Sequence, residues 1–238
     1  MPPTASRALV ITAHPDDVDF GAAGTVAWLV ETGWEVAYCV VTDGDAGGFD
    51  VSVDRARIPA IRRAEQTEAA AVLGVRELHW LGYRDGQLEP TLALRRDLAR
   101  VIRTVRPQRV LCPSPERLWS GRIGRNHPDH LAAGEAALRA VYPDARNPFA
   151  FPELAAEGLE AHTVDEVWVM GGPDPDLFVD VTDHLDRKVA ALRCHVSQET
   201  DRDGQLEQRM RGWLAVTAAA GGLSEGRLAE AYRRLETA

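Results

Sequence analysis

Short apolar runs alternate with longer amphipathic segments along most of the chain, and this alternation predicts the fold class. The runs have the length and β-branched content of buried strands, and the segments between them carry apolar residues at helical spacing. A repeated strand–helix–strand order predicts right-handed crossovers, so we expect an α/β, Rossmann-like three-layer sandwich with a mostly parallel sheet. The expected strands are Ala8–Thr12, Glu35–Thr42, Glu77–Leu81, Arg109–Pro113 and Glu166–Met170. The expected helices cover about 20–33, 57–74, 91–106, 129–141 and 183–196.

Two segments depart from this rhythm. Residues 143–163 carry three prolines, and we expect them to form a loop over the carboxyl edge of the sheet. Residues 205–238 are rich in Ala, Leu, Glu and Arg, which predicts a C-terminal helical extension. No internal repeat or low-complexity tract divides the chain, so residues 1–238 are expected to form one domain.

Composition narrows the choice of partners and compartment. Hydrophobic residues make up 45% of the 238 residues, which is enough for a sizeable core, and the formal net charge is −9. That charge argues against nucleic-acid binding, which depends on clustered Lys and Arg. No apolar run approaches the length of a membrane span, so we expect a cytoplasmic protein without a membrane partner. The odd number of well-separated cysteines predicts free thiols, and a homo-oligomer is compatible with the sequence.

Two short motifs carry most of the chemical information. Ala13-His14-Pro15-Asp16-Asp17 follows the first expected strand, where Pro15 prevents the strand from continuing. Asn126-His127-Pro128-Asp129-His130 precedes an expected helix, with a proline suited to its first turn. Open α/β sheets bind ligands at the carboxyl ends of their strands, so both motifs are expected to converge there.

Imidazole and carboxylate groups from these motifs predict a metal site. A catalytic zinc takes three protein ligands and keeps a fourth position for water, and His and Asp three residues apart can face the same side of a turn. Each motif alone also fits a helix N-terminus, where carboxylates are stabilised by the helix dipole. The occurrence of both at matching junctions favours the metal site, with Zn²⁺ or Fe²⁺ as the ion.

The motifs resemble those of the PIG-L/LmbE-like deacetylase family. The resemblance rests on Ala-His-Pro-Asp-Asp-Val-Asp-Phe-Gly from residue 13 and on His-Pro-Asp-His from residue 127. It extends over about residues 7–200, through Val-Thr-Asp-Gly-Asp-Ala-Gly at 41–47, Leu-Gly-Tyr-Arg-Asp-Gly at 81–86 and His-Val-Ser-Gln at 195–198. The resemblance implies a hydrolase that removes acyl groups from N-acetylglucosamine-type amides, including precursors of mycothiol and bacillithiol.

The resemblance also implies the metal ligands. Carried over by position, His14, Asp17 and His130 match the ligands of the family's metal. The sequence departs from the common pattern at Val18, where many members carry Glu, but this position is not a ligand.

The same correspondence implies three catalytic groups. Asp16 matches the general base that takes a proton from water, and His127 matches the residue that polarises the carbonyl and stabilises the oxyanion or the leaving amine. Asp129 matches the acid that orients His127 and keeps it charged, which requires the pKa of His127 to be raised.

Four further side chains are candidates for contacts with an acylated amino-sugar substrate. Arg62 could reach the site, but it is also spaced for a helical ion pair with Glu65. Asp85 lies in a glycine-flanked turn, which turn chemistry alone also explains. Asp45 stands where the corresponding turn of the family often has Glu, a departure that could alter the sugar pocket. Trp119 lies on a loop and could stack on a sugar ring or simply cover the edge of the core.

Three alternative functions remain open at this level. The site could cleave a larger amide, such as a thiol conjugate, and release no acetate. A His-x-Asp pattern with a distant His also describes non-haem Fe(II) oxygenases, although those sites usually lie in β-barrels. The third alternative is a non-catalytic sugar-binding module on the same scaffold.

Overall fold

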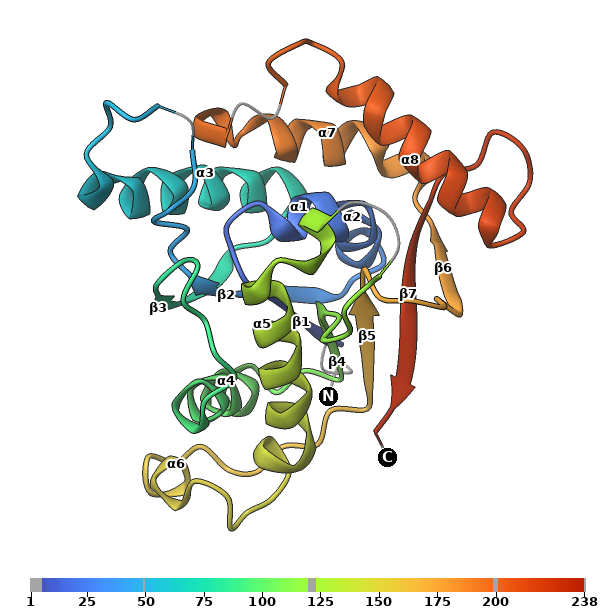
Figure 1. The fold of residues 1–238 in the computed structure, drawn as a ribbon. Helices are drawn as coiled ribbons and strands as arrows, with labels where there is room; N and C mark the ends of the chain where they lie inside the picture. Colours follow the sequence, from blue (N-terminus) through green and yellow to red (C-terminus); the bar gives the residue numbers. More distant parts are fainter. Residues whose placement is uncertain (1–5, 49, 120–122, 199–200, 238) are drawn as a thin grey trace.

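A seven-stranded sheet forms the centre of the molecule, with helices on both faces (Figure 1). The computed structural model describes residues 6–48, 50–119, 123–198 and 201–237. The strand order is β3-β2-β1-β4-β5-β7-β6, in which β1 to β5 are parallel and β7 runs antiparallel to both β5 and β6. The strands are β1 (Arg7–Thr12), β2 (Glu35–Thr42), β3 (Glu77–Tyr83), β4 (Arg109–Pro113), β5 (Glu166–Met170), β6 (Leu177–Asp180) and β7 (Ala229–Glu236).

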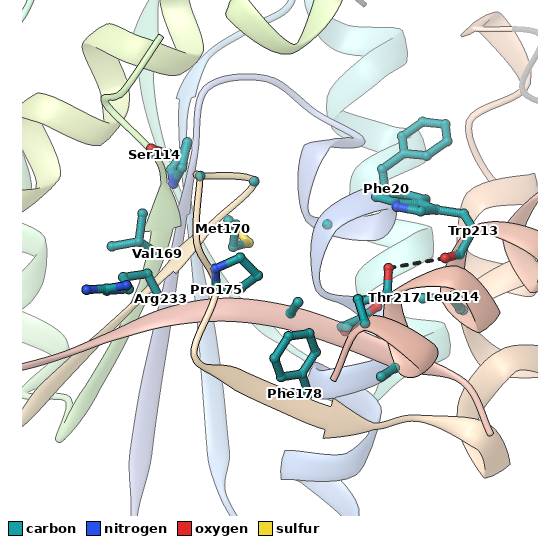
Figure 2. A pocket seen from close by; sticks show the side chains of 18 of the residues that line it. Phe20, Ser114, Val169, Met170, Pro175, Phe178, Trp213, Leu214, Thr217 and Arg233 are labelled. Carbon is teal, nitrogen blue, oxygen red and sulfur yellow. Dashed lines mark hydrogen bonds between the residues drawn. The ribbon is translucent and has the colours of Figure 1, made fainter. Parts of the chain in front are cut away.

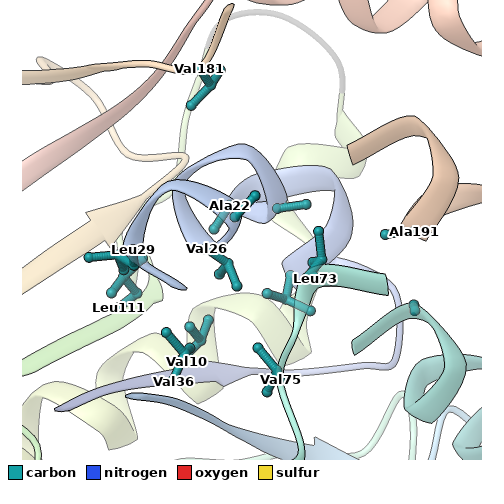
Figure 3. Packing of buried hydrophobic residues seen from close by; sticks show 14 of the residues in the cluster. Val10, Ala22, Val26, Leu29, Val36, Leu73, Val75, Leu111, Val181 and Ala191 are labelled. Carbon is teal, nitrogen blue, oxygen red and sulfur yellow. The ribbon is translucent and has the colours of Figure 1, made fainter. Parts of the chain in front are cut away.

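The helices divide between the two faces because successive side chains of each strand point to opposite sides. Ala8 and Val10 of β1 join one buried cluster, whereas Leu9 and Ile11 join the other. Figure 3 shows the first cluster, in which Val10 lies near Val26 and Leu29. Its helices are α1 (Asp17–Gly21), α2 (Ala23–Glu31), α3 (Ile58–Leu73), α7 (Leu185–Arg193) and α8 (Leu206–Ala220). The opposite face carries α4 (Leu92–Val105), α5 (Pro128–Arg139), α6 (Pro152–Ala156) and the π-helical turn η3 (Ala140–Ala145). Short 3₁₀ turns complete the elements: η1 (Arg55–Arg57), η2 (Ile123–Asn126), η4 (Thr182–His184) and η5 (Val196–Gln198).

The strand order explains where a site can form. From β1 the chain passes through α1 and α2 to β2 on one side, whereas β4 pairs with β1 on the other side. The chain therefore leaves β1 and β4 in opposite directions along the sheet. The loops that follow these two neighbouring strands begin side by side at the same edge, as they do at the ligand sites of other open α/β sheets. Both histidine motifs follow these two strands, so the topology brings them together.

The five strands expected from the apolar runs and the α/β sandwich are confirmed. The first expected helix, 20–33, is divided in two at Ala22, whose φ of −145° interrupts the helical backbone.

The C-terminal segment differs from the prediction. Helix α8 was expected, but Ala229–Glu236 forms strand β7 instead of a further helix, and β6 was not predicted. Tertiary pairing overrides the helix-favouring composition here, because β7 fills the gap between β5 and β6 and bonds to both. Tyr232 of β7 is completely buried, and its hydroxyl donates to Thr25 Oγ1 at 2.7 Å.

The proline-rich segment 143–163 lies at the opposite edge of the sheet from the one expected. His162 Nε2 lies 2.7 Å from the carbonyl oxygen of Pro107, just before β4 begins. Arg103, near the end of α4, donates to the carbonyls of Asp144, Asn147 and Ala150 at 2.9–3.0 Å. These contacts hold the segment where the parallel strands start, so it does not cover the carboxyl edge.

The three cysteines are free thiols, as the sequence predicts. Cys39 and Cys112 are buried in β2 and β4, and Cys194 is half-buried after α7; all three are free. Within the described ranges, the helices are too short or too polar to span a lipid bilayer.

The anchoring role of Arg103 leads to a stability prediction. Arg103 is only 2% exposed, and its replacement by Met leaves several buried carbonyls without a donor. We expect Arg103→Met to lower the free energy of unfolding in urea by about 3 kcal/mol. Arg100→Met is the matched control, since Arg100 lies one turn earlier in α4 and pairs with Glu157 at the surface, where a loss below about 1 kcal/mol is expected. Equal losses in the two variants would contradict the anchoring role.

Candidate functional site

The first motif forms a sharp turn between β1 and α1. Asp16 has a φ of 88°, in the left-handed region, and its carbonyl accepts the first hydrogen bonds of α1 from Asp19 and Phe20. A non-glycine residue in this region costs about 1–3 kcal/mol, so the surrounding contacts must hold it there. Gln66 Oε1 accepts the Asp16 backbone N–H at 2.7 Å, and Arg62 Nη2 donates to Asp16 Oδ2 at 3.1 Å. The turn thus directs Asp16 and Asp17 to the carboxyl edge of the sheet.

The second motif forms the start of α5. His127 occupies the N-cap position, and its Nδ1 accepts the backbone N–H of Asp129 at 3.2 Å. Pro128 takes the first helical position, where its missing N–H is not needed. His130 follows in the first turn, so both histidines face the end of β1.

His14, Asp17 and His130 come together as the correspondence implied. The nitrogens His14 Nδ1 and His130 Nε2 are 3.3 Å apart. Asp17 Oδ1 lies 3.0 Å from His130 Nε2, and its Oδ2 lies 3.5 Å from His14 Nδ1. Ligands about 2.0–2.1 Å from a tetrahedral zinc lie about 3.3 Å from one another, so the three donors fit such an ion.

Two other groups of donors share His14. One nitrogen each of His14, His127 and His130 lie within 4.8 Å of one another, as do donors of His14, Asp85 and Asp129. The second group faces the other nitrogen of His14, since Nε2 lies 3.1 Å from both Asp85 Oδ1 and Asp129 Oδ2. Carboxylates that accept the second ring N–H of a metal-binding histidine fix its tautomer. We therefore assign Nε2–H to this contact, which leaves Nδ1 free to bind a cation.

The Asp129 carboxylate has a different partner from the one expected. It is completely buried, and it accepts the N–H groups of Gly86 at 2.7 Å and Leu88 at 3.2 Å. It also accepts the Nε2–H of His14 at 3.1 Å, and it is not the His127 ring that this carboxylate contacts. The pKa of His127 is also lowered and not raised, because burial and the nearby His14 and His130 outweigh the attraction of Asp129. A lowered pKa favours the neutral form of the His127 ring at neutral pH.

The electrostatics of the cluster favour a positive charge at its centre. Burial alone would lower the pKa of His14, but hydrogen bonds to Asp129 and Asp17 outweigh it and raise the pKa to about 12. The pKa of His130 is raised in the same way, since the charge of Asp17 overcomes burial. A divalent cation would meet the same excess of carboxylate charge.

Asp16 has the properties of a proton acceptor near neutral pH. Burial and the adjacent Asp17 raise its pKa to about 7, although Arg62 opposes the shift. A general base is most effective when its pKa is near the working pH.

The four candidates for substrate contact occupy different environments. Arg62 is 3% exposed and bonds to the carbonyls of Pro15 and Gly44; it does not pair with Glu65, which bonds to Ser197. A Cβ at Gly44 would lie 2.3 Å from Arg62 Nη1, so this glycine leaves space for the arginine. Arg62 thus holds both the backbone before Asp16 and the Asp16 carboxylate in place.

Of the other three candidates, only Asp85 contacts the cluster. Asp85 Oδ1 lies 3.1 Å from His14 Nε2, on the side of the ring away from Asp17. The Asp45 carboxylate accepts hydrogen bonds from Arg55 and from the backbone N–H of Asp85, both at 2.9 Å. Trp119 is 90% exposed beside Arg117. Contact of any of these residues with a substrate stays a prediction.

Sequence reasoning missed a buried network that supports α1. Asp19 Oδ2 accepts hydrogen bonds from Gln66 Nε2 and His195 Nε2, both at 2.8 Å. Lys188 Nζ donates to the carbonyl of Asp19 and to Glu230 of β7. His195 belongs to a motif that the family resemblance had marked, but no local spacing pairs it with a residue 176 positions earlier.

Two cavities open from the cluster. A polar one of about 320 Å³ is lined by His14, Asp16, Arg62, Asp85, His127 and glycine-rich turns. A mostly apolar one of about 630 Å³ contacts Asp17 and His130, and Figure 2 shows part of its lining. The segment 143–163 is not part of either lining among the described residues, consistent with its place at the far edge.

Comparisons with known proteins agree with this geometry. The family model described as PIG-L, GlcNAc-PI de-N-acetylase, matches residues 9–141, which include both motifs. The chain is 35% identical to a diacetylchitobiose deacetylase of Thermococcus kodakarensis over 192 residues, 81% of this chain and 70% of the relative. It is 32% identical to a probable N-acetyl-α-D-glucosaminyl L-malate deacetylase of Bacillus cereus, over 80% of this chain and 82% of the relative. A solved structure of N,N′-diacetylchitobiose deacetylase from Pyrococcus horikoshii superposes with a TM-score of 0.87 at 30% identity, over 98% of this chain and 84% of that one.

The contact between Asp129 and His14 leads to a prediction about metal affinity. If Asp129 orients His14, the variant Asp129→Asn should bind zinc about 10- to 100-fold more weakly in calorimetric titrations. If Asp129 acts on His127 alone, the same variant should keep the wild-type zinc affinity. Asp144→Asn is the control, because Asp144 is also buried but pairs with Arg95 far from the cluster. Wild-type zinc affinity in Asp129→Asn would refute the assignment.

Proposed function

The chain belongs to the PIG-L family of de-N-acetylases and is an amide hydrolase, and we propose that it is a zinc-dependent enzyme that removes an acyl group from an N-acetylglucosamine-type amide. One observation carries the proposal: a carboxylate with a pKa near neutrality, Asp16, is fixed beside a set of donors that fits zinc. Relatives named as deacetylases of acetylated amino sugars support the substrate class.

His14, Asp17 and His130 would hold the metal. Their two imidazoles and one carboxylate are a common ligand set for catalytic zinc, although iron(II) accepts the same donors. A bound divalent cation acts as a Lewis acid and lowers the pKa of water toward about 7.

Asp16 would accept the proton of the attacking water. Arg62 and Gln66 keep its strained backbone and carboxylate in place, so little reorganisation is needed when the proton moves. The departing nitrogen needs one proton to leave as an amine, and protonated Asp16 carries it. The overall balance is one amide and one water converted to one carboxylic acid and one amine.

His127 would hold the carbonyl oxygen as it gains negative charge. Because its Nδ1 accepts the backbone N–H of Asp129, the proton of the neutral ring lies on Nε2 and is available to donate. This differs from the protonated imidazole expected at first, and it fits the lowered pKa of His127.

The polar cavity is suited to the sugar. Backbone and polar groups at Ala46, Gly47, Asp85 and Gly86 line it next to His127, where ring hydroxyls need hydrogen-bond partners. We further propose that the whole chain acts as one domain, since β7 completes the sheet, and that it works in the cytoplasm, where buried thiols such as Cys39 stay reduced.

An amine-release screen tests the function. We expect zinc-loaded protein to release free amine and a carboxylic acid from N-acetylglucosaminyl compounds such as diacetylchitobiose, N-acetylglucosaminyl malate and the inositol glycoside. Chelation should abolish turnover, and added zinc should restore it, because the cation activates the water. An enzyme with equal activity before and after chelation would exclude the metal-dependent mechanism.

The role of Asp16 is tested separately from metal binding. Asp16→Asn removes the proton acceptor but none of the proposed ligands, so kcat should fall about 10²- to 10⁴-fold while zinc stoichiometry is retained. Asp43→Asn is the control, since Asp43 pairs with Arg63 outside the cluster and should keep wild-type kcat. Near-normal kcat in Asp16→Asn would overturn the assignment of the base.

A further inference from the structure

The larger cavity is an apolar chamber that begins at the proposed metal ligands. Its volume is about 630 Å³, and it extends from Asp17 and His130 to α8, β6 and β7. Large apolar side chains from α1, β5, β6 and α8 surround it, and Figure 2 labels Phe20, Met170, Phe178, Trp213 and Leu214 among them.

Gly21 and Asp17 of α1 both line the end of the chamber that is nearest to the donor cluster. The two residues are four apart in α1, so they lie on the same face of the helix, and both line the chamber. A Cβ at Gly21 would lie 3.3 Å from Met170 Sδ, which shows how closely α1 approaches the far wall. With glycine at this position, no side chain fills the space between α1 and Met170 at the end of the chamber next to Asp17.

The two cavities lie on different sides of the donor cluster. Among the described residues no side chain lines both, yet His14 lines the polar cavity while Asp17 and His130 line the apolar chamber. Asp16, which would carry the proton to the departing amine, lines the polar cavity, so the amine belongs on that side. The acyl carbon chain of the same amide then points into the apolar chamber.

Two polar groups in the chamber wall, the Glu230 carboxylate and the Thr217 hydroxyl, are already bonded within the protein. The Glu230 carboxylate accepts the N–H groups of Gly24 and Thr25 and pairs with Lys188. Thr217 Oγ1 donates to the Trp213 carbonyl, the contact drawn in Figure 2. These two groups are not free for sugar hydroxyls, whereas methylene groups would lose water against the apolar side chains without losing hydrogen bonds.

We propose that this chamber binds the acyl group of the substrate, and that the enzyme prefers N-acyl amino sugars whose unbranched acyl chain is longer than acetyl. The inference rests on the proposed function, because it places the scissile amide at the donor cluster. Water cleaves the C–N bond, the acyl carbon leaves as a fatty acid, and the nitrogen leaves as the amine of the sugar.

A substrate series tests the preference. We expect kcat/KM of the zinc-loaded full chain to rise about threefold for each methylene from N-acetyl- through N-butanoyl- to N-hexanoylglucosamine, near the gain for burying one CH₂. Hexyl N-acetylglucosaminide carries the same chain on the sugar side and should gain little. A gain for the hexyl glycoside without one for the hexanoyl amide would overturn the proposal.

A matched pair of variants locates the effect. Ala219 and Ala220 are both exposed in the last turn of α8, but only Ala220 is among the described residues lining the chamber. Ala220→Trp should lower the ratio of hexanoyl to acetyl kcat/KM at least about tenfold, because the indole occupies chamber volume. Ala219→Trp should leave the ratio unchanged. Equal effects in both variants would contradict binding in the chamber.

A binding measurement independent of turnover completes the test. Hexanoate should bind the zinc-loaded protein at least about 50-fold more tightly than acetate in calorimetric titrations, and Ala220→Trp should remove the difference. If a second copy covers the chamber instead, sedimentation shows a dimer that Ala220→Trp dissociates and hexanoate has no advantage, which overturns the proposal. Hydrolysis of N-acetylglucosamine compounds without a chain-length preference defeats this inference alone, whereas hydrolysis of neither amide defeats the proposed function.

Discussion

The rest of the site depends on the contacts that hold the imidazole of His14 between two pairs of side chains. Its two nitrogens serve opposite sides: Nε2 is held by the carboxylates of Asp85 and Asp129, and Nδ1 faces Asp17 and His130. The buried carboxylates fix the ring and its tautomer, so the orientation needed for a cation exists before a cation binds. Because Asp129 also accepts two backbone N–H groups from the loop before α4, one side chain joins the ends of β1 and β3 to the start of α5.

Around this contact, the protein maintains a strained turn at Asp16. The left-handed backbone is held from α3, where Gln66 and Arg62 contact Asp16 from two sides. Gln66 also bonds to Asp19, which His195 contacts from beyond α7. Asp16, the proposed base, is thus fixed by residues of several distant elements, an arrangement expected where a side chain must keep its geometry while a proton moves.

The same cluster separates two chemical environments. On one side, glycine turns and charged groups form a small polar cavity; on the other, α1, α8 and the antiparallel end of the sheet enclose apolar space. An amide has a comparable division between its amine and its acyl carbon chain. Strand β7 makes the second environment possible, because its insertion beside β5 provides a wall that a purely parallel sheet ending at β5 would lack.

The sequence by itself determined the five parallel strands and the two histidine motifs, since strand periodicity, proline positions and ligand spacing are local properties. It also predicted that donors of both motifs would meet, because βα loops after neighbouring strands share one edge, and the family resemblance implied which donors these are. Only the tertiary structure decided that Asp129 serves His14 and not His127, and that 143–163 packs under Arg103 at the opposite edge. Pairing with β5 and β6 also decided that Ala229–Glu236 forms a strand and not a helix. Each of these depends on contacts between residues far apart in the chain, where burial and pairing outweigh the local preference.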